Sequence, residues 1–260
     1  MNKGTLGGIG IAISGIAVGL YLDGGHVSQM LQPTAALIVF GGTLGAVMVQ
    51  FPFSVVRQAA RQLKDIFIHS PDPTKQLVDD MMRYAMKARK HGLLSLDADL
   101  NSVRDRFLRK ALMLAVDGAQ PPELRQSMEL EMIRQAENED QIPKVFEAAG
   151  GFAPTIGILG AVIGLIQVMQ HLDNIDAVGR GIAVAFVATI YGVGSANIFF
   201  LPCAGRIKTL MGRKQVLREM MLDGVVAIVD RTNPRVLEAN LNVYLNRSTV
   251  PVPEKKRVAV

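Results

Sequence analysis

The sequence predicts an all-α polytopic membrane protein with four transmembrane helices and a helical cytoplasmic domain. Four stretches contain no Asp, Glu, Lys or Arg, namely 4–22, 28–56, 148–172 and 181–205. Each exceeds the roughly 18 apolar residues that indicate a membrane span, because a helix needs about 20 residues to cross ~30 Å of hydrocarbon. A globular core rarely holds four such helices. No convincing two-residue alternation with hairpin turns predicts a strand.

The charges between the spans predict their orientation. The two short connections, 23–27 and 173–180, contain a single basic residue, Arg180, whereas segment 57–147 contains 15 Lys and Arg. Five more basic residues follow the fourth span within 206–218. Because loops on the cytoplasmic side carry the excess of Lys and Arg, the N-terminus, the long segment and the C-terminal tail are predicted to be cytoplasmic.

These assignments divide the chain into four parts. They are transmembrane helices 1 and 2 (4–56), a cytoplasmic helical domain (57–147), transmembrane helices 3 and 4 (148–205), and cytoplasmic C-terminal helices with a tail (206–260). The long segment also contains 15 acidic residues. It is therefore balanced in charge, and the remaining basic residues flank the spans, so no nucleic-acid binding is predicted.

Proline and glycine punctuate the predicted cytoplasmic helices. One helix follows Pro73 and stops at Gly92, a second runs from about 96 to 116, and a third starts at Pro121 and continues toward the third span. Two more are predicted at 211–229 and 234–245. Segment 248–260 contains two prolines and a Lys-Lys-Arg cluster and is predicted to be disordered.

Small residues and prolines mark the third and fourth spans. Gly157, Gly160 and Gly164 share one helix face and permit close approach of another helix, which is common in helical membrane proteins. Pro154 and Pro202 each leave an upstream carbonyl without its helical partner, which permits a hinge or simply a kink or helix end.

The spans contain no ionisable carboxylate, amine or guanidinium. A protein that moves protons or metal cations through a membrane usually needs such a group at depth. If this chain conducts ions, the carboxylate must come from another chain. The sequence also contains no nucleotide-binding loop, catalytic constellation or cluster of metal ligands, so no enzyme activity, cofactor or metal is predicted.

Four stretches resemble the MotA/PomA family of flagellar stator proteins, most closely its PomA-like branch. They are Ala185 to Gly192 with Pro202 ten residues later, Ala153 to Gly157 with Gly160 and Gly164, Asp223-Gly224 with Asn233-Pro234-Arg235, and Ala88-Arg89-Lys90 with Leu94 and Asp97. The stretches are spread along the chain, and the resemblance covers nearly all of it to about Leu245. Gly194 departs from the pattern, which usually has an aliphatic residue there.

The resemblance implies a function and partners. MotA-type subunits are expected to form a homo-oligomeric ring of five copies in the bacterial inner membrane, around a dimer of a single-span, peptidoglycan-binding MotB/PomB-type subunit. That partner carries the intramembrane aspartate that this chain lacks. Ion flow past the aspartate would drive the ring, whose cytoplasmic domains would push on the rotor protein FliG.

The resemblance also implies roles for individual residues. The ion path would involve Thr189, Ala161 and Thr155. Pro154 and Pro202 would couple ion passage to conformational change, while Gly157, Gly160, Gly164 and Gly192 would pack helices. Arg89, Lys90 and Asp97 would face FliG, although exposed charges are more often only a solvated surface.

Alternatives remain for the function and for the ion. An ExbB/TolQ-like energiser usually has three spans and an outward N-terminus, whereas four spans are predicted here. A solute transporter typically shows inverted repeats, which this sequence lacks. Sodium-driven relatives usually carry a threonine at the position of Ala161, and a hydroxyl helps to replace the hydration shell of Na⁺. Ala161 therefore favours protons over Na⁺.

Overall fold

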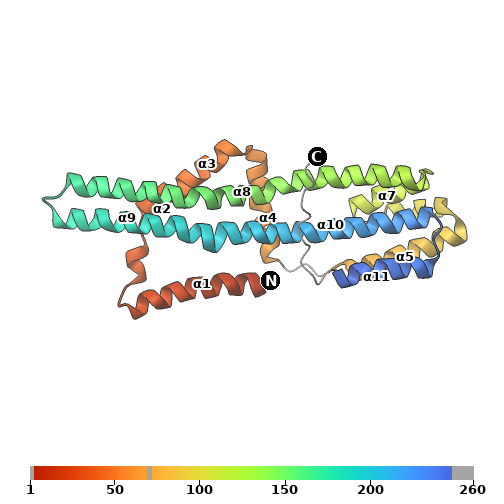
Figure 1. Cartoon of the computed structure of the whole chain (residues 1–260), viewed down its shortest axis with the longest axis horizontal. Helices are drawn as coiled ribbons and strands as arrows, with labels where there is room; N and C mark the ends of the chain where they lie inside the picture. Colours follow the sequence, from red (N-terminus) through yellow and green to blue (C-terminus); the bar gives the residue numbers. More distant parts are fainter. Residues whose placement is uncertain (1–2, 69–71, 248–260) are drawn as a thin grey trace, which may run out of the picture. The chain divides into compact units, whose positions relative to one another are not determined.

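The computed structural model describes residues 3–68 and 72–247 (Figure 1). The predicted disorder of 248–260 falls outside these residues. The chain divides into two compact units, Met1–His69 with Asp140–Lys208 and Ser70–Glu139 with Thr209–Val260. Two long helices, α8 (Pro121–Gln170) and α10 (Leu201–Val229), contribute residues to both units.

The predicted all-α membrane fold is confirmed. The described residues contain no strand. Four helical stretches are long and apolar enough to cross a membrane: Gly4–Leu22, Pro33–Gln50, one within Pro121–Gln170 and one within Ile175–Val229. The first of them, in α1 (Lys3–Leu22), has none of its residues buried.

The second span is shorter than the predicted 28–56. A short 3₁₀ turn, η1 (Val27–Met30), precedes it, and its helix comprises α2 (Pro33–Ala36), a π-helical turn η2 (Leu37–Gly41) and α3 (Gly42–Gln50). Pro33 suits the first helical position, where no N–H donor is needed. The helix ends because Phe51, which precedes Pro52, is extended at φ −123° and ψ 143°. Helix α4 (Phe53–Phe67) then begins.

Tyr191, in α9 (Ile175–Ser195), fixes the start of the second span. Its hydroxyl donates to the Met30 carbonyl at 2.5 Å and accepts from the Gln32 N–H at 3.3 Å. Its ring also stacks on Phe40, with 5.9 Å between ring centroids. A side chain more than 150 residues away thus caps the N-terminus of this helix, which has no side-chain cap of its own.

Helices α8 and α9 lie close together because glycines line their contact. A Cβ atom added to Gly157 would lie 2.8 Å from the Ala188 carbonyl oxygen, and one added to Gly164 would lie 2.8 Å from the Gly181 carbonyl oxygen. From the other helix, a Cβ at Gly192 would lie 2.5 Å from the Ala153 carbonyl oxygen. All three distances are too short for a real Cβ atom, so only glycine fits at these positions without a shift of the helices.

The fourth span continues without a break into the following helix. A π-helical turn, η4 (Ala196–Phe200), joins α9 to α10, so the predicted helix at 211–229 is the second part of a longer one. Pro202 is the second residue after this turn. The wider π turn accommodates a proline, which would otherwise clash with the carbonyl four residues earlier.

The other unit packs helices around an apolar core. Its elements are α5 (Thr74–His91), η3 (Leu93–Leu96), α6 (Asp97–Leu100), α7 (Arg106–Val116), the first part of α8, the last part of α10 and α11 (Pro234–Arg247). Met81, Leu112 and Met128 are completely buried in this core. Gly92 ends α5 as predicted, with a φ of +83° that favours glycine.

The single helix predicted at 96–116 is wrong. The chain leaves the helical conformation between α6 and α7, at 101–105. There the Asp105 carboxylate accepts hydrogen bonds from the N–H groups of Phe107 (2.8 Å) and Leu108 (3.0 Å), which starts a new helix. The Arg109 guanidinium donates to the carbonyl of the buried Val103, so the break leaves that carbonyl with a hydrogen-bond partner.

Polar contacts join the helices of this unit. The Asp223 carboxylate accepts from the Arg125 guanidinium at 2.8 Å and from the Tyr244 hydroxyl at 2.6 Å, which links α8, α10 and α11. The hydrogen bond to Asp223 raises the pKa of Arg125. The Lys110 ammonium, 2.7 Å from Glu131, lowers the pKa of that carboxyl with help from Gln135.

The glycine contact predicts a position-specific loss of stability. Gly192→Ala should destabilise the protein by about 1–3 kcal/mol, because the added methyl group must push α8 and α9 apart. Gly194→Ala, in the same helix, should be neutral or slightly stabilising, since nothing lies within 4 Å of a Cβ there. Thermal unfolding of the purified protein in detergent would measure both variants. Equal midpoints for the two would show that the close approach carries no stability.

Candidate functional site

The helices α8 and α9 form the framework of the candidate ion path. On α8, the second span contacts Ile156, whose Cγ2 would lie 2.9 Å from a Cβ at Gly42. On α9, it packs against Val187 and Ala188. Successive residues advance by ~100° around a helix. Ala161 on α8 and Thr189 on α9 therefore fall on the opposite flank of the glycine contact, which the second span leaves open.

Ala161 and Thr189 also lie within about one helical turn of each other along the helix pair. Gly157 faces Ala188 and Gly192, whereas Gly164 faces Gly181 and Ala185. Ala161 is about midway between the two glycines of α8, and thus opposite the turn that contains Thr189. The structure thereby brings together two of the three residues assigned to the ion path.

The hydroxyl groups of Thr189, on this flank, and of Thr155, about 160° around α8 from Gly157, are available as acceptors. Thr189 is half-buried, and its Oγ1 donates to the Ala185 carbonyl at 3.2 Å. Thr155 is exposed, one to two turns away along α8, and its Oγ1 donates to the Phe152 carbonyl at 2.8 Å. Each hydroxyl thus donates its hydrogen bond within its own helix, and its oxygen can still accept one from a water molecule or bind a cation.

No acidic group lies near these hydroxyls in the sequence of either helix. The nearest carboxylate of α8 is Glu147, eight residues before Thr155, and it pairs with the Lys208 ammonium at 2.5 Å. In α9 the only acid is Asp176, in the first turn. Among the described residues, no group of His, Cys, Asp and Glu is suited to hold a metal ion. The flank can accept hydrogen bonds, but it cannot take up a proton by itself.

The two candidate hinge prolines belong to neighbouring turns. Pro154 lies inside α8 and leaves the Gly150 carbonyl without the N–H four residues later. A Cβ at Gly150 would lie 2.6 Å from the Leu201 side chain, which directly precedes Pro202. The two positions at which proline interrupts the helical hydrogen bonds, Pro154 and Pro202, are therefore adjacent. Sequence reasoning missed a third proline inside α8, Pro143, because the pattern there showed no break.

The three candidate rotor-contact residues lie at one corner of the other unit. Arg89 and Lys90 occupy the last turn of α5, and Asp97 is the first residue of α6. All three are exposed, and none forms an ion pair with another residue that the structure describes. An ion pair that sequence reasoning missed, Lys87 to Asp99 at 2.6 Å, joins the two helices beside them.

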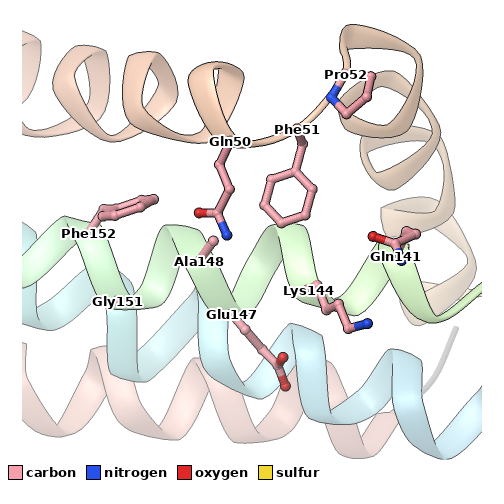
Figure 2. A pocket seen from close by; sticks show the side chains of 9 residues that line it. All are labelled: Gln50, Phe51, Pro52, Gln141, Lys144, Glu147, Ala148, Gly151 and Phe152. Carbon is pink, nitrogen blue, oxygen red and sulfur yellow. The ribbon is translucent and has the colours of Figure 1, made fainter.

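A cavity of about 520 Å³ lies where the turn between α3 and α4 meets α8. Figure 2 shows the Phe51 ring pointing from this turn toward α8, with Lys144 and Glu147 on the helix below. The ring is 8% exposed. It anchors the end of the second span and fixes where α4 begins.

The sequence and the fold are similar to those of known motility proteins. Residues 99–221 match the MotA/TolQ/ExbB proton channel family, and residues 6–92 match the motility protein A N-terminal family. The chain is 35% identical to motility protein A of Bacillus subtilis, over 94% of this chain and 91% of that protein.

Two solved structures share the fold. One is a structure of C. jejuni MotAB, with a TM-score of 0.89, 29% identity and coverage of 98% of this chain and 100% of that chain. The other is the flagellar MotAB stator complex from Bacillus subtilis, with a TM-score of 0.84, 35% identity and coverage of 92% and 94%. The resemblance identified from the four motifs is confirmed, and the chain belongs to the motility protein A branch of the MotA/TolQ/ExbB proton channel family.

Proposed function

We propose that this chain, a stator subunit of the flagellar motor, forms a ring around a MotB-type partner and couples proton flow across the inner membrane to torque on FliG. One observation carries the proposal: the open flank of α8 and α9 presents a hydroxyl acceptor at Thr189 but no carboxylate. An ion path needs an acid that can titrate, so this flank is suited to face a chain that supplies one.

The known relatives support the partner and the class of function. Solved members of the family are MotAB complexes, and one of them is a flagellar stator. The family consists of stator and ion-channel subunits, so this chain is not an enzyme. The match of residues 6–92 to the motility protein A N-terminal family favours the stator over an ExbB/TolQ-like energiser. Five copies and contact with FliG rest on the sequence resemblance.

The orientation of the chain is part of the proposal. The basic residues of segment 57–147 and those after the fourth span favour a cytoplasmic location for both termini and for the unit that carries Arg89. The connections between the first two spans and between the last two would then face the periplasm.

Protons fit the open flank better than Na⁺. A dehydrated Na⁺ needs several oxygen ligands at once, whereas a proton needs a carboxylate, a chain of waters and one polar neighbour. At the level of the partner's aspartate, Thr189 offers one hydroxyl and Ala161 offers none. In the proposed cycle Thr189 Oγ1 orients a water or the protonated carboxyl, and the neutralised aspartate is then free to move past the apolar surface.

Helices α8 and α9–α10 each lack regular helical hydrogen bonds near Pro154 and Pro202. These two neighbouring positions are therefore suited to convert the movement of the aspartate into helix bending. At Pro154 the Gly150 carbonyl lacks its helical partner, and at Pro202 the ladder is already widened to a π turn. Bending costs less at such positions than in an intact helix. The neighbouring contact between Gly150 and Leu201 would make the two helices bend together.

The function proposal predicts strict dependence on a partner. Expressed alone in a cell that lacks all stator genes, this chain should restore no flagellar rotation, because its spans have no group that can exchange a proton. Expressed with a MotB-type subunit, it should restore rotation, and replacing the partner's membrane aspartate by Asn should abolish it. Tethered-cell rotation measures this. Rotation driven by the chain alone would refute the proposal.

The ion assignment makes a separate prediction. Motor speed should follow the proton motive force and be unaffected by external Na⁺ at fixed pH and membrane potential. Thr189→Val should slow the motor, because the hydroxyl acceptor is lost in a side chain of nearly the same shape. Thr189→Ser should retain most of the speed. A speed that rises and saturates with Na⁺ would overturn the choice of ion and leave the stator assignment intact.

If the two prolines act as hinges, replacing them should stop motor rotation and leave assembly with the partner intact. Pro154→Leu and Pro202→Leu should each yield a protein that reaches the membrane and binds its partner but fails to turn the rotor, because a continuous hydrogen-bond ladder stiffens the helix. Pro143→Leu, in the same helix as Pro154, serves as the control and should rotate the motor. Membrane levels, partner co-purification and rotation are measured together. If both hinge variants disappear from the membrane, the prolines serve packing.

Contact with the rotor should depend on charge. Arg89→Glu with Lys90→Glu should lower torque and be partly rescued by opposite charge reversals on FliG, because attraction becomes repulsion. A single exposed pair contributes only ~0.2–1 kcal/mol, so the double change is the informative one. The control is Lys75→Glu, an exposed position in the first turn of the same helix. Normal torque in the double variant would show that this corner does not touch the rotor.

A further inference from the structure

Helix α4 has one buried face and one basic face. Ala59 and Ile66 are 1% and 0% exposed and pack against the rest of their own unit. Arg57, Arg61 and Lys64 are exposed and lie about 140–200° around the helix from Ala59, at ~100° per residue. The three cations therefore form a single stripe that points away from the helices on which α4 packs.

The charges of this stripe are not used inside the unit. Neither arginine nor the lysine forms an ion pair or a side-chain hydrogen bond with any residue within 3–68 or 72–247. The single acid of α4, Asp65, lies on the flank of the stripe, so the helix retains a net positive charge of two. Exposed cations at these spacings repel one another by a few tenths of a kcal/mol, so the arrangement stabilises nothing within the chain.

The stripe lies at the level of the membrane surface. Helix α4 begins at Phe53, three residues after the second span ends at Gln50, and the buried Phe51 anchors the turn between them (Figure 2). In Figure 1 α4 runs across α8 and not along it, so the cations do not recede from the end of the span. Phe53 is 65% exposed in the same helix as Arg57, and helices that combine exposed Phe with Lys and Arg are typical of the membrane–water interface.

We propose that Arg57, Arg61 and Lys64 form a binding surface for the headgroups of anionic phospholipids. Guanidinium groups bind phosphate oxygens through two parallel hydrogen bonds, and the lysine adds a point charge. Each cation near an anionic membrane surface contributes an attraction equivalent to about a fivefold change in affinity. The bound headgroups would hold α4 at the membrane surface and so fix the end of the second span, independently of which ion drives the motor.

Lipid selectivity measures this directly. The full chain with its partner is placed in phosphatidylcholine nanodiscs that contain a trace of spin-labelled phosphatidylglycerol or phosphatidylcholine. The fraction of motionally restricted label gives the preference of the protein for the anionic lipid. Arg57→Gln with Arg61→Gln and Lys64→Gln should reduce this preference at least about twofold, because only some of the surrounding lipids touch α4. Arg57→Lys with Arg61→Lys should keep most of it.

Two controls separate the stripe from general charge and from folding. Lys75→Gln with Arg89→Gln and Lys90→Gln removes three exposed cations from α5 and should leave the preference unchanged. For the unmodified protein, raising NaCl from about 0.1 M to 1 M should weaken the preference, because the Debye length falls from ~10 Å to ~3 Å. An unchanged preference in the α4 variant, or insensitivity of the unmodified protein to salt, would overturn the proposal. Loss of rotation with intact lipid preference in the α4 variant would assign the stripe to an acidic protein partner instead.

Discussion

The contact between α8 and α9 leaves no room for a methyl group, since a Cβ at Gly192 would lie 2.5 Å from the Ala153 carbonyl oxygen. Inside a bilayer, lipid tails are as apolar as leucine, so helices gain little by burying apolar side chains against each other. Close backbone contact through glycines is then a main source of attraction. The spacing set by these glycines determines which side chains of the two helices are level with one another.

Much of the membrane unit depends on that spacing. It places Ala161 level with the turn that contains Thr189, and it brings the turn with the free Gly150 carbonyl beside the turn that precedes Pro202. It also sets the position of Tyr191, whose hydroxyl binds Met30 and Gln32 at the start of the second span. A wider separation would disturb the candidate path, the candidate hinge and the second span at once.

In the proposed function the acid and the ion path belong to different chains, and this division has a physical reason. A carboxylate at the bilayer centre costs several kcal/mol unless it is paired or hydrated, so a subunit without one can fold and pack as an ordinary helix pair. Thr155 and Thr189 satisfy their protons within their own helices and impose little such cost. In the proposed complex, the energetic cost of a membrane acid would arise only when the partner assembles with the ring.

Sequence reasoning located the spans and most helices because hydropathy, proline and glycine are local signals. The end of α5 at Gly92 was predicted correctly, since the required φ of +83° is a property of that residue. The break before Asp105 was missed because the apolar spacing continues across it, and only the hydrogen bonds to Phe107 and Leu108 show the new start.

The candidate site was predictable only in part. Thr189 and Ala161 were assigned from the family resemblance, and their common level follows from contacts between helices that periodicity does not reveal. The π turn before Pro202, the cap provided by Tyr191 and the pairing of Lys87 with Asp99 depend on partners distant in sequence or on backbone geometry. The periodicity of a single helix predicts none of these three features.

The two units are joined by three crossings of the chain. The chain passes between the units near residue 69, within α8 at Glu139 and Asp140, and within α10 at Lys208 and Thr209. Two of these three crossings are therefore inside continuous helices.

The two helical crossings are also braced on both sides of the boundary. In the membrane unit Lys208 pairs with Glu147 at 2.5 Å. In the other unit Arg218 donates to both carboxylate oxygens of Glu139, at 3.1 and 2.6 Å, and its side chain is only 13% exposed. A bidentate, mostly buried pair holds its geometry far better than an exposed one. Each unit thus holds its own segments of α8 and α10 together by an ion pair, which opposes independent sliding of the two helices within that unit.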